Sequence, residues 1–225
     1  GTVRAELGGT QTDMTDAVAL TKDLAIFGRP GLTVLRAART KRHFIVTDYH
    51  TLSLRWIKLT RANIQPINGD HKDNTGGSVY LDNHGKLIAT FCLFTLNHAK
   101  QGGSIYASGG AVVELFDTNV TKSYMEQGHS RGGGIFVTYG ASLTWNGGEL
   151  SENSCSSSSC ALPPCCHHDG GGGCFCTGAS KCLFQNVDVR NNIINDHGRG
   201  GGIYIDNTGK LSFGNVTFEG NKGNN

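Results

Sequence analysis

The sequence predicts an all-β fold: a right-handed parallel β-helix (solenoid) of about seven coils with a Cys-rich inserted loop. The first observation is a repeat, since five segments open on glycines and continue with an apolar and then an aromatic residue. They are Gly76-Gly77-Ser78-Val79-Tyr80, Gly102-Gly103-Ser104-Ile105-Tyr106, Gly132-Gly133-Gly134-Ile135-Phe136, Gly171-Gly172-Gly173-Cys174-Phe175 and Gly200-Gly201-Gly202-Ile203-Tyr204. The second is that apolar and polar residues alternate, as in Leu211-Ser212-Phe213, which is the period of a half-buried strand. The third is that no unit has the spacing of an amphipathic helix, about 3.6 residues.

The repeat extends well beyond its opening glycines. Eight residues after the apolar residue stand Leu87, Val113, Leu143, Cys182 and Leu211; ten after it stand Ala89, Leu115, Trp145, Phe184 and Phe213; fifteen after it stand Phe94, Val120, Leu150, Val189 and Phe218. An Asn closes four units, at Asn97, Asn153, Asn192 and Asn221, and Ser123 has this place in the second unit. One unit cannot bury its own apolar face, but stacked units can, so equivalent residues should form ladders between coils about 4.8 Å apart. The right-handed turn follows from the preferred handedness of crossovers between parallel strands.

The paired motifs GGx-[ILV] and FxxN carry a family resemblance. They stand as Gly76-Gly77-Ser78-Val79 with Phe94-Thr95-Leu96-Asn97, and as residues 200–203 with Phe218-Glu219-Gly220-Asn221. The chain resembles the repeats of the chlamydial polymorphic membrane proteins, which resemble the wider pectate-lyase-like group of right-handed β-helices. The likeness covers residues 76–225 well and the N-terminal third loosely. It implies a β-helix in a surface or secreted protein and says little about chemistry.

We expect one β-helix domain over residues 1–225. It comprises N-terminal coils over 1–62, coils with the full repeat over 76–153 and 171–225, and the Cys-rich insertion over 154–170. Residues 1–11 carry no assignment; residues 16–28 should form two short strands around a turn, and residues 32–35 a third.

An early coil follows these strands. Alignment with the repeat places Phe44 on Ile203, Leu52 on Leu211 and Leu59 on Phe218, so this coil lacks only the opening glycines. The chain stops shortly after Asn221 without a visible cap, so we expect further coils or another protein chain at an open C-terminal end.

Charge and hydropathy limit the classes of function. The net charge of +2 argues against nucleic-acid binding by the chain as a whole, and no apolar run is long enough for a membrane span. Residues 1–62 nevertheless contain ten Lys and Arg against five Asp and Glu. The chain begins with Gly and shows no signal peptide, so we expect a processed product that is extracellular or on the cell surface.

Seven of the eight cysteines lie between residues 155 and 182. This density favours disulfides that staple the insertion to the coil beneath it, with candidates Cys155, Cys160, Cys165, Cys166, Cys174 and Cys176. Cys182 falls on the inward ladder of Leu211 and is expected to keep a free thiol. Cys92 aligns with Ile57 and Val216 and is expected to be a buried small hydrophobe.

A zinc site is the alternative for this cluster, because Cys165-Cys166-His167-His168 and Cys174-Phe175-Cys176 contain zinc-ligating residue types. Adjacent Cys-Cys and His-His pairs direct their side chains apart, however, and no pair of CxxC motifs is present. Disulfides are therefore favoured, and we predict neither a metal nor a cofactor.

Two N-glycosylation sequons occur, at Asn119 and Asn215, although Asn in these places also serves a turn. The closing Asn residues are better explained as a structural ladder of stacked amides than as catalytic groups.

The aromatic residue after each apolar one forms a column that should point away from the core. Its members are Tyr80, Tyr106, Phe136, Phe175 and Tyr204. The column is a candidate strip for stacking sugar rings, but an aromatic ladder that stiffens the coils is favoured. The basic run over residues 36–42, with Arg55 and Lys58, could dock an acidic polysaccharide or an anionic surface, and a solvated face is the simpler explanation.

The residue pattern identifies no catalytic group. Polysaccharide lyases of this fold need clustered acids for calcium and an Arg or Lys base, and related hydrolases need paired carboxylates. Asp169, Asp188, Asp196 and His197 do not share one column. We therefore expect a non-enzymatic extracellular or cell-surface protein, an adhesin or a structural module. The alternatives are a lyase-like enzyme with its site in loops 63–75 and 154–170, or a carbohydrate-binding module that uses the aromatic column.

Overall fold

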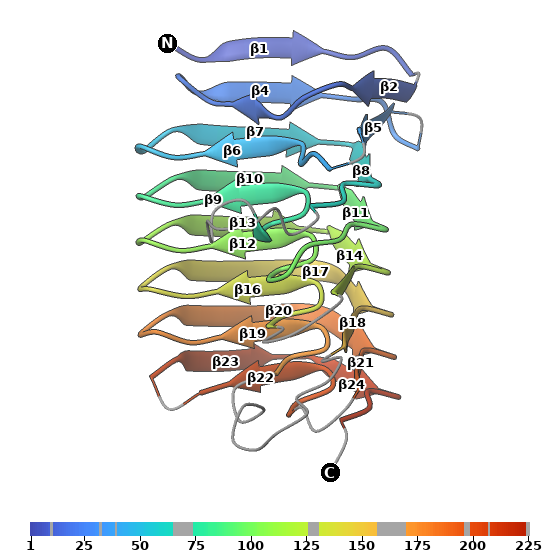
Figure 1. Ribbon diagram of the computed structural model, residues 1–225, viewed down its shortest axis with the longest axis vertical. Helices are drawn as coiled ribbons and strands as arrows, with labels where there is room; N and C mark the ends of the chain where they lie inside the picture. The colour runs from blue at the N-terminus through green and yellow to red at the C-terminus, as the bar shows by residue number, and fades with distance from the viewer. Residues whose placement is uncertain are drawn as a thin grey trace.

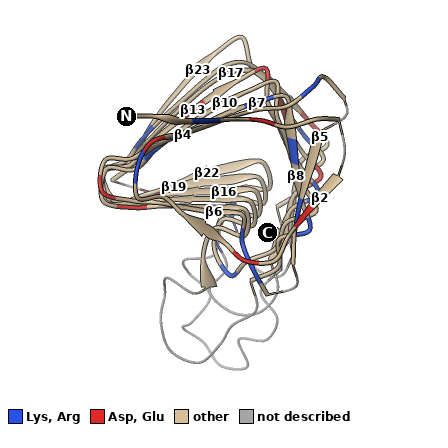
Figure 2. Ribbon diagram, turned by 90° about the horizontal axis from the view of Figure 1, so that it is seen from above, with Lys and Arg blue, Asp and Glu red and all other residues tan. Residues whose placement is uncertain are grey.

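The computed structural model is a parallel β-helix, as the repeat predicts (Figure 1). It describes residues 1–9, 11–31, 33–38, 40–64, 74–125, 131–156, 170–195, 199–206 and 208–223. Followed from top to bottom in Figure 1, the chain runs rightwards at the back and leftwards at the front, so the coil is right-handed. Viewed end-on in Figure 2, three walls enclose the interior.

The strands of successive coils build three walls, which we name by their place in Figure 1. The front wall contains β3 (Val18–Ala19), β6 (Phe44–Val46), β9 (Val79–Leu81), β12 (Ile105–Ala107), β16 (Ile135–Val137), β19 (Cys174–Cys176) and β22 (Ile203–Ile205). The back wall contains β1 (Val3–Glu6), β4 (Leu24–Phe27), β7 (Thr51–Arg55), β10 (Lys86–Thr90), β13 (Val112–Phe116), β17 (Ser142–Ser151), β20 (Lys181–Arg190) and β23 (Lys210–Gly214).

The side wall continues from the back wall. It contains β2 (Gln11–Met14), β5 (Thr33–Ala37), β8 (Ile57–Thr60), β11 (Leu93–Thr95), β14 (Asn119–Thr121), the second halves of β17 and β20, and β24 (Thr217–Glu219). A short sheet of β15 (Tyr124–Met125), β18 (Ser154–Ser156) and β21 (Ile193–Asn195) follows it in the later coils. Among the described residues, the front wall has seven strands and the back wall eight, which agrees with the expected number of about seven coils.

The register of the front wall confirms the alignment read from the sequence. Paired residues stack in the order Phe44, Val79, Ile105, Ile135, Cys174 and Ile203. Leu52 pairs with Leu87 on the back wall and Leu59 with Phe94 on the side wall, so the early coil has the predicted phase. These inward residues form one continuous apolar interior.

The N-terminal segment forms the first coil. Strand β1 pairs with β4, and β2 pairs with β5, so residues without an expected role add a layer to two walls. The expected short strands are present as β3, β4 and β5. Leu32 and Arg39 lie outside the described residues.

The opening glycines are required by the close approach of neighbouring coils. A Cβ atom at Gly133 would clash with the carbonyl oxygen of Gly172 on the next coil and lie 2.6 Å from that of Ser154. Gly132, which precedes it, has a φ of 66°. This pair therefore needs both the absent side chain and the left-handed conformation that glycine permits.

His43 is a fully buried histidine whose pKa is lowered in the folded protein. Its Nε2 donates to the carbonyl of Leu35 at 3.0 Å, since a carbonyl can only accept, which leaves Nδ1 to accept from the Ser78 hydroxyl at 3.0 Å. Burial lowers the pKa of His43 from 6.5 to about 4, outweighing the carbonyl contacts of Leu35 and Thr60 that raise it. The ring is therefore neutral in the folded protein at neutral pH.

We expect acid to destabilise the protein through this residue. The unfolded chain takes up a proton on His43 near pH 6.5, whereas the folded chain does so only near pH 4. Stability is therefore fully present above pH 6.5 and falls towards pH 4, by about 3 kcal/mol from this group alone. Urea midpoints measured near pH 6.5 and near pH 4 check this: wild type should lose more stability on acidification than His43→Leu. Equal losses would show that His43 does not titrate as argued.

Candidate functional site

A series of residues with positive φ lies at the corner between the back and side walls. In the six coils from Phe44 onwards, the residue twelve positions after the front-wall residue of the inward ladder has a positive φ: Trp56, Phe91, Asp117, Gly147, Asn186 and Asn215. Glycine, Asn and Asp tolerate the left-handed conformation, whereas large aromatic residues are costly there. Trp56 and Phe91 are thus not what the backbone prefers, and such strain tends to collect at functional sites.

The two aromatic rings form a platform with an arginine across it. The ring centres of Trp56 and Phe91 are 6.0 Å apart with planes 14° from parallel. The guanidinium carbon of Arg55 lies 4.1 Å from the Trp56 ring centre and 5.8 Å from that of Phe91. Phe91 is 45% exposed. Arg55 also pairs with Phe27 in the coil above, whose ring carries Arg4 at 4.6 Å.

We call this strip of Arg4, Phe27, Arg55, Trp56 and Phe91 the aromatic–arginine corner. Two surface hollows adjoin it, with Trp56 in both. One, of about 420 Å³, is also lined by Phe91, Lys58, Asp117 and Asn119. The other, of about 550 Å³, is also lined by Arg4, Phe27, Arg29 and Arg55.

The charge at the corner is predominantly positive. Arg4 is paired with Glu6 at 3.0 Å. Within the described part of the chain, Arg29, Arg55 and Lys58 form no ion pair. Flat aromatic faces beside cationic groups can bind a ligand that has both apolar ring faces and negative charge.

The predicted aromatic column is present as a ladder of rings on the front wall. Tyr80, Tyr106, Phe136, Phe175 and Tyr204 pair in register, with successive ring centres 5.4, 5.6, 5.3 and 5.0 Å apart. Tyr80, Phe136 and Phe175 are only 5%, 2% and 3% exposed. A sugar ring cannot stack on these three in this structure, which favours the ladder explanation over a glycan strip.

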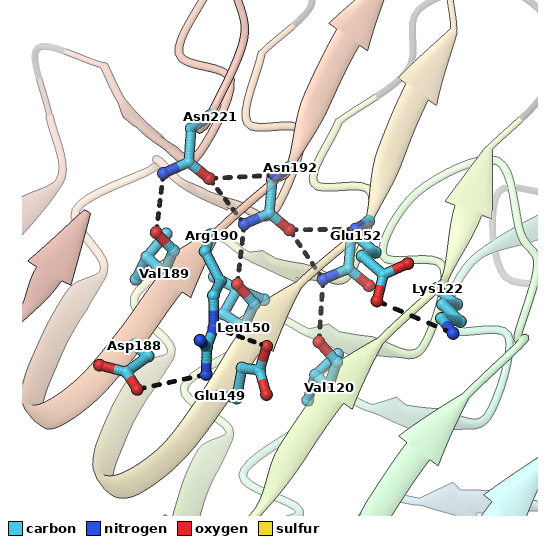
Figure 3. Close-up of polar contacts among 11 residues, drawn as sticks. Val120, Lys122, Glu149, Leu150, Glu152, Asp188, Val189, Arg190, Asn192 and Asn221 are labelled. Atoms are coloured by element: carbon cyan, nitrogen blue, oxygen red, sulfur yellow. Dashed lines mark hydrogen bonds and ion pairs between the residues drawn. The ribbon is translucent and has the colours of Figure 1, made fainter. Parts of the chain in front are cut away.

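The closing Asn residues form the predicted amide ladder (Figure 3). Asn192 Nδ2 donates to the Leu150 carbonyl at 2.8 Å and to Asn221 Oδ1 at 2.9 Å. Its Oδ1 accepts from the backbone N–H and the Nδ2 of Asn153, at 3.1 and 3.0 Å. Asn153 Oδ1 in turn accepts from the backbone of Ser123. These amides are engaged with the coil backbone, so their role is structural.

The two sequons lie at different places on this side of the molecule. Asn119 is half-buried on β14 and lines the smaller hollow. Asn215 is at the corner with a φ of 52°, and its Nδ2 donates to Asn186 Oδ1, which extends a second, exposed amide ladder from Asn146. Glycosylation at either position stays a prediction.

The structure corrects part of the disulfide prediction. Cys174 and Cys176 have free thiols and belong to the apolar interior of the β-helix. Cys155 is buried in a small cluster with Met125 and Ile194. Cys160, Cys165 and Cys166 lie outside the described residues. Cys182 and Cys92 are buried free thiols, as expected.

Other candidate groups do not gather into a site. Arg36 lies on β5 and Arg42 is buried with its guanidinium over the Tyr80 ring, so the basic run does not form one exposed face. Asp188 pairs with Arg190 at 3.4 Å (Figure 3), whereas Asp169, Asp196 and His197 lie outside the described residues. Across the described ranges, no group of three His, Cys, Asp or Glu residues is suited to hold a metal ion. The same ranges contain no helix with the length and hydropathy needed to cross a membrane.

Sequence reasoning missed the aromatic–arginine corner, although the signal was present. The alignment that matched Cys92 with Ile57 also places Phe91 against Trp56 one residue earlier. No protein-family model matches the chain, and no curated protein matches it in sequence.

Proposed function

We propose that this chain is a non-enzymatic extracellular or cell-surface β-helical module, an adhesin or structural protein, that binds its partner through the aromatic–arginine corner. The supporting observation is the pair of aromatic residues at left-handed positions. Later coils fill the same place with Gly147, Asn186 and Asn215, which suit the backbone better. Trp56 and Phe91 therefore cost stability, and a binding role explains why such residues stand there.

The chemistry of the corner favours an acidic polysaccharide. Sugar rings present apolar faces that stack on aromatic rings, and uronate carboxylates would pair with Arg29, Arg55 and Lys58. The two hollows follow one another across successive coils and share Trp56, so they suit an extended polymer. Asp117 is the one acid of the smaller hollow within the described residues and would disfavour a polyanion locally.

Two single variants, in which Trp56 or Phe91 is replaced by Asn, test the proposal. Trp56→Asn and Phe91→Asn install the residue type that the corner has at Asn186 and Asn215, so each variant should be at least as stable as wild type. Each should nevertheless weaken binding of polygalacturonate about tenfold, because the stacking face is lost. Affinity electrophoresis in gels containing the polymer measures the change.

Asp117→Asn is the matched control at the same corner. It removes a negative charge from the hollow and should retain or strengthen binding, and added salt should weaken binding by all proteins. Unchanged binding by both aromatic variants would reject the corner as the site. Tighter binding of a neutral polysaccharide than of polygalacturonate would reject the ligand class.

The C-terminal coil is the second surface to which we assign a partner. Phe213 and Phe218 are 48% and 50% exposed, whereas their counterparts Phe184 and Val189 in the preceding coil are fully buried. A further coil or another protein chain that adds strands at this edge would bury them.

A polysaccharide lyase-like enzyme is the alternative function. It would also bind a uronate polymer, so binding alone does not separate the two proposals. Release of unsaturated products, followed by their ultraviolet absorbance, would favour the enzyme.

A further inference from the structure

Three thiols meet inside a single coil of the β-helix. Cys174 and Cys176 are at the two ends of β19 on the front wall, and Cys182 is the second residue of β20 on the back wall. Their exposed fractions are 0%, 0% and 2%. All three side chains belong to the buried apolar cluster; burial raises the pKa of Cys182, and the neighbouring Cys174 and Cys176 thiols raise it further.

Packing alone does not require sulfur at these positions. The coil above has Ile135, Val137 and Leu143 in register with the three cysteines, and the coil below has Ile203, Ile205 and Leu211. Aliphatic side chains therefore fill the same places on both sides. This coil alone has cysteine at all three positions among the coils that the repeat defines.

Cys176 and Cys182 are the two of these cysteines that a single turn connects. They flank the tight turn over residues 177–180, in which the Ser180 N–H donates to the Thr177 carbonyl at 3.2 Å. This turn joins the front wall to the back wall, and the side chains on both sides of it belong to the buried apolar interior. Cys174 lies two residues further along β19, away from the turn.

We propose that Cys176 and Cys182 form an internal disulfide that links the front and back walls of this coil, with Cys174 left as a thiol. The site is distinct from the predicted staple between the coil and the insertion, and it makes Cys182 a bridging residue instead of the residual thiol. It does not depend on the proposed binding function.

The reaction needs an oxidant of the small-molecule disulfide class, such as glutathione disulfide. The Cys176 thiolate attacks one sulfur of the oxidant and releases the first small thiol, which leaves a mixed disulfide on Cys176. The Cys182 thiolate then attacks Cys176 Sγ and releases the second small thiol. Two protein thiols lose two protons and two electrons, and the oxidant is reduced to two thiols.

The environment of the pair supports this order. The side-chain hydrogen bond from Cys182 lowers the pKa of Cys176, whereas burial raises the pKa of Cys182. Because both residues are buried in the folded coil, the bond should form while the coil closes during folding.

Refolding with glutathione disulfide, followed by alkylation in denaturant and peptide mapping, tests the proposal. We expect a Cys176–Cys182 link, with Cys174 and Cys92 alkylated. Full alkylation of Cys176 and Cys182 to the level of Cys92 would overturn it. A link from Cys182 to Cys174, or from either residue to the insertion cysteines, would overturn the assigned pair.

Variants taken from the neighbouring coils provide the controls. Cys176→Val and Cys182→Leu copy Val137 and Leu143, so both should fold. Each should abolish the rise in melting temperature that oxidation gives the wild type. Cys174→Ile, which copies Ile135, should retain that rise. The proposal would be contradicted if oxidation failed to raise the melting temperature of Cys174→Ile but still raised that of Cys176→Val and Cys182→Leu.

Discussion

Replacing Asn192 by Ala is expected to lower the free energy of unfolding by about 3–5 kcal/mol, because buried backbone groups lose their partners. Asn192 is fully buried and forms four hydrogen bonds within the amide ladder. Without its side chain, the buried N–H of Asn153 loses the acceptor Asn192 Oδ1, and the carbonyl of Leu150 loses the hydrogen bond from Asn192 Nδ2. The ladder would also lose the side-chain hydrogen bonds of Asn192 to Asn153 and Asn221.

Asn146→Ala is the control for this effect. Asn146 belongs to the exposed amide ladder and accepts one hydrogen bond, from Asn186 Nδ2 at 2.9 Å. Water can replace this contact, so the variant should lie within about 0.5 kcal/mol of wild type. Urea denaturation of both variants measures the difference. Similar losses from the two variants would show that the buried ladder does not stabilise the coils as argued.

Gly132→Ala is expected to abolish folding or to cost more than about 4 kcal/mol. Gly132 has a φ of 66°, and a Cβ atom there would clash with the carbonyl oxygen of Ile135 and lie 2.6 Å from its carbon. Both atoms belong to the backbone of the same coil, so neither can move without shifting β16 out of register with its neighbours. The variant combines an unfavourable conformation with a clash.

Gly140→Ala separates the two effects. Gly140 has a similar φ of 74°, but a Cβ atom there has no neighbour within 4 Å. Its cost should therefore be that of the left-handed conformation alone, about 1 kcal/mol. Soluble yield and thermal unfolding of the two proteins give the comparison. A Gly140→Ala variant as damaged as Gly132→Ala would contradict the account of close backbone contact.

The register could be predicted because the same residue types recur at fixed offsets. Val79, Ile105, Ile135 and Ile203 share one inward ladder, and the period of a strand allows no other face once the apolar residues are buried. The amide ladder was predictable for the same reason, since Asn closes four units. The first coil could not be predicted, because residues 1–14 lack the repeat. Its strands β1 and β2 are recognised by their pairing with β4 and β5 in the structure.

Side-chain environments were harder to predict than register. Cys174 stands at the position of Ile135, which already indicated an inward thiol, but the density of nearby cysteines suggested an external staple. The burial of Phe136 and Phe175 depends on what covers the front wall, which no spacing within one unit reveals. Trp56 and Phe91 were overlooked because a corner residue belongs to neither strand period, although it recurs at a fixed offset.

The most direct test of the binding proposal follows the polymer and its chain ends in one sample. Polygalacturonate is incubated with the protein, and both the bound polymer and the reducing ends in solution are measured over time. Any lyase or hydrolase creates a reducing end with each cleavage. We predict saturable binding that Trp56→Asn weakens, with reducing ends unchanged. A sustained rise in reducing ends, or the absence of binding by the wild-type protein, would contradict the proposal that this β-helix acts by binding alone.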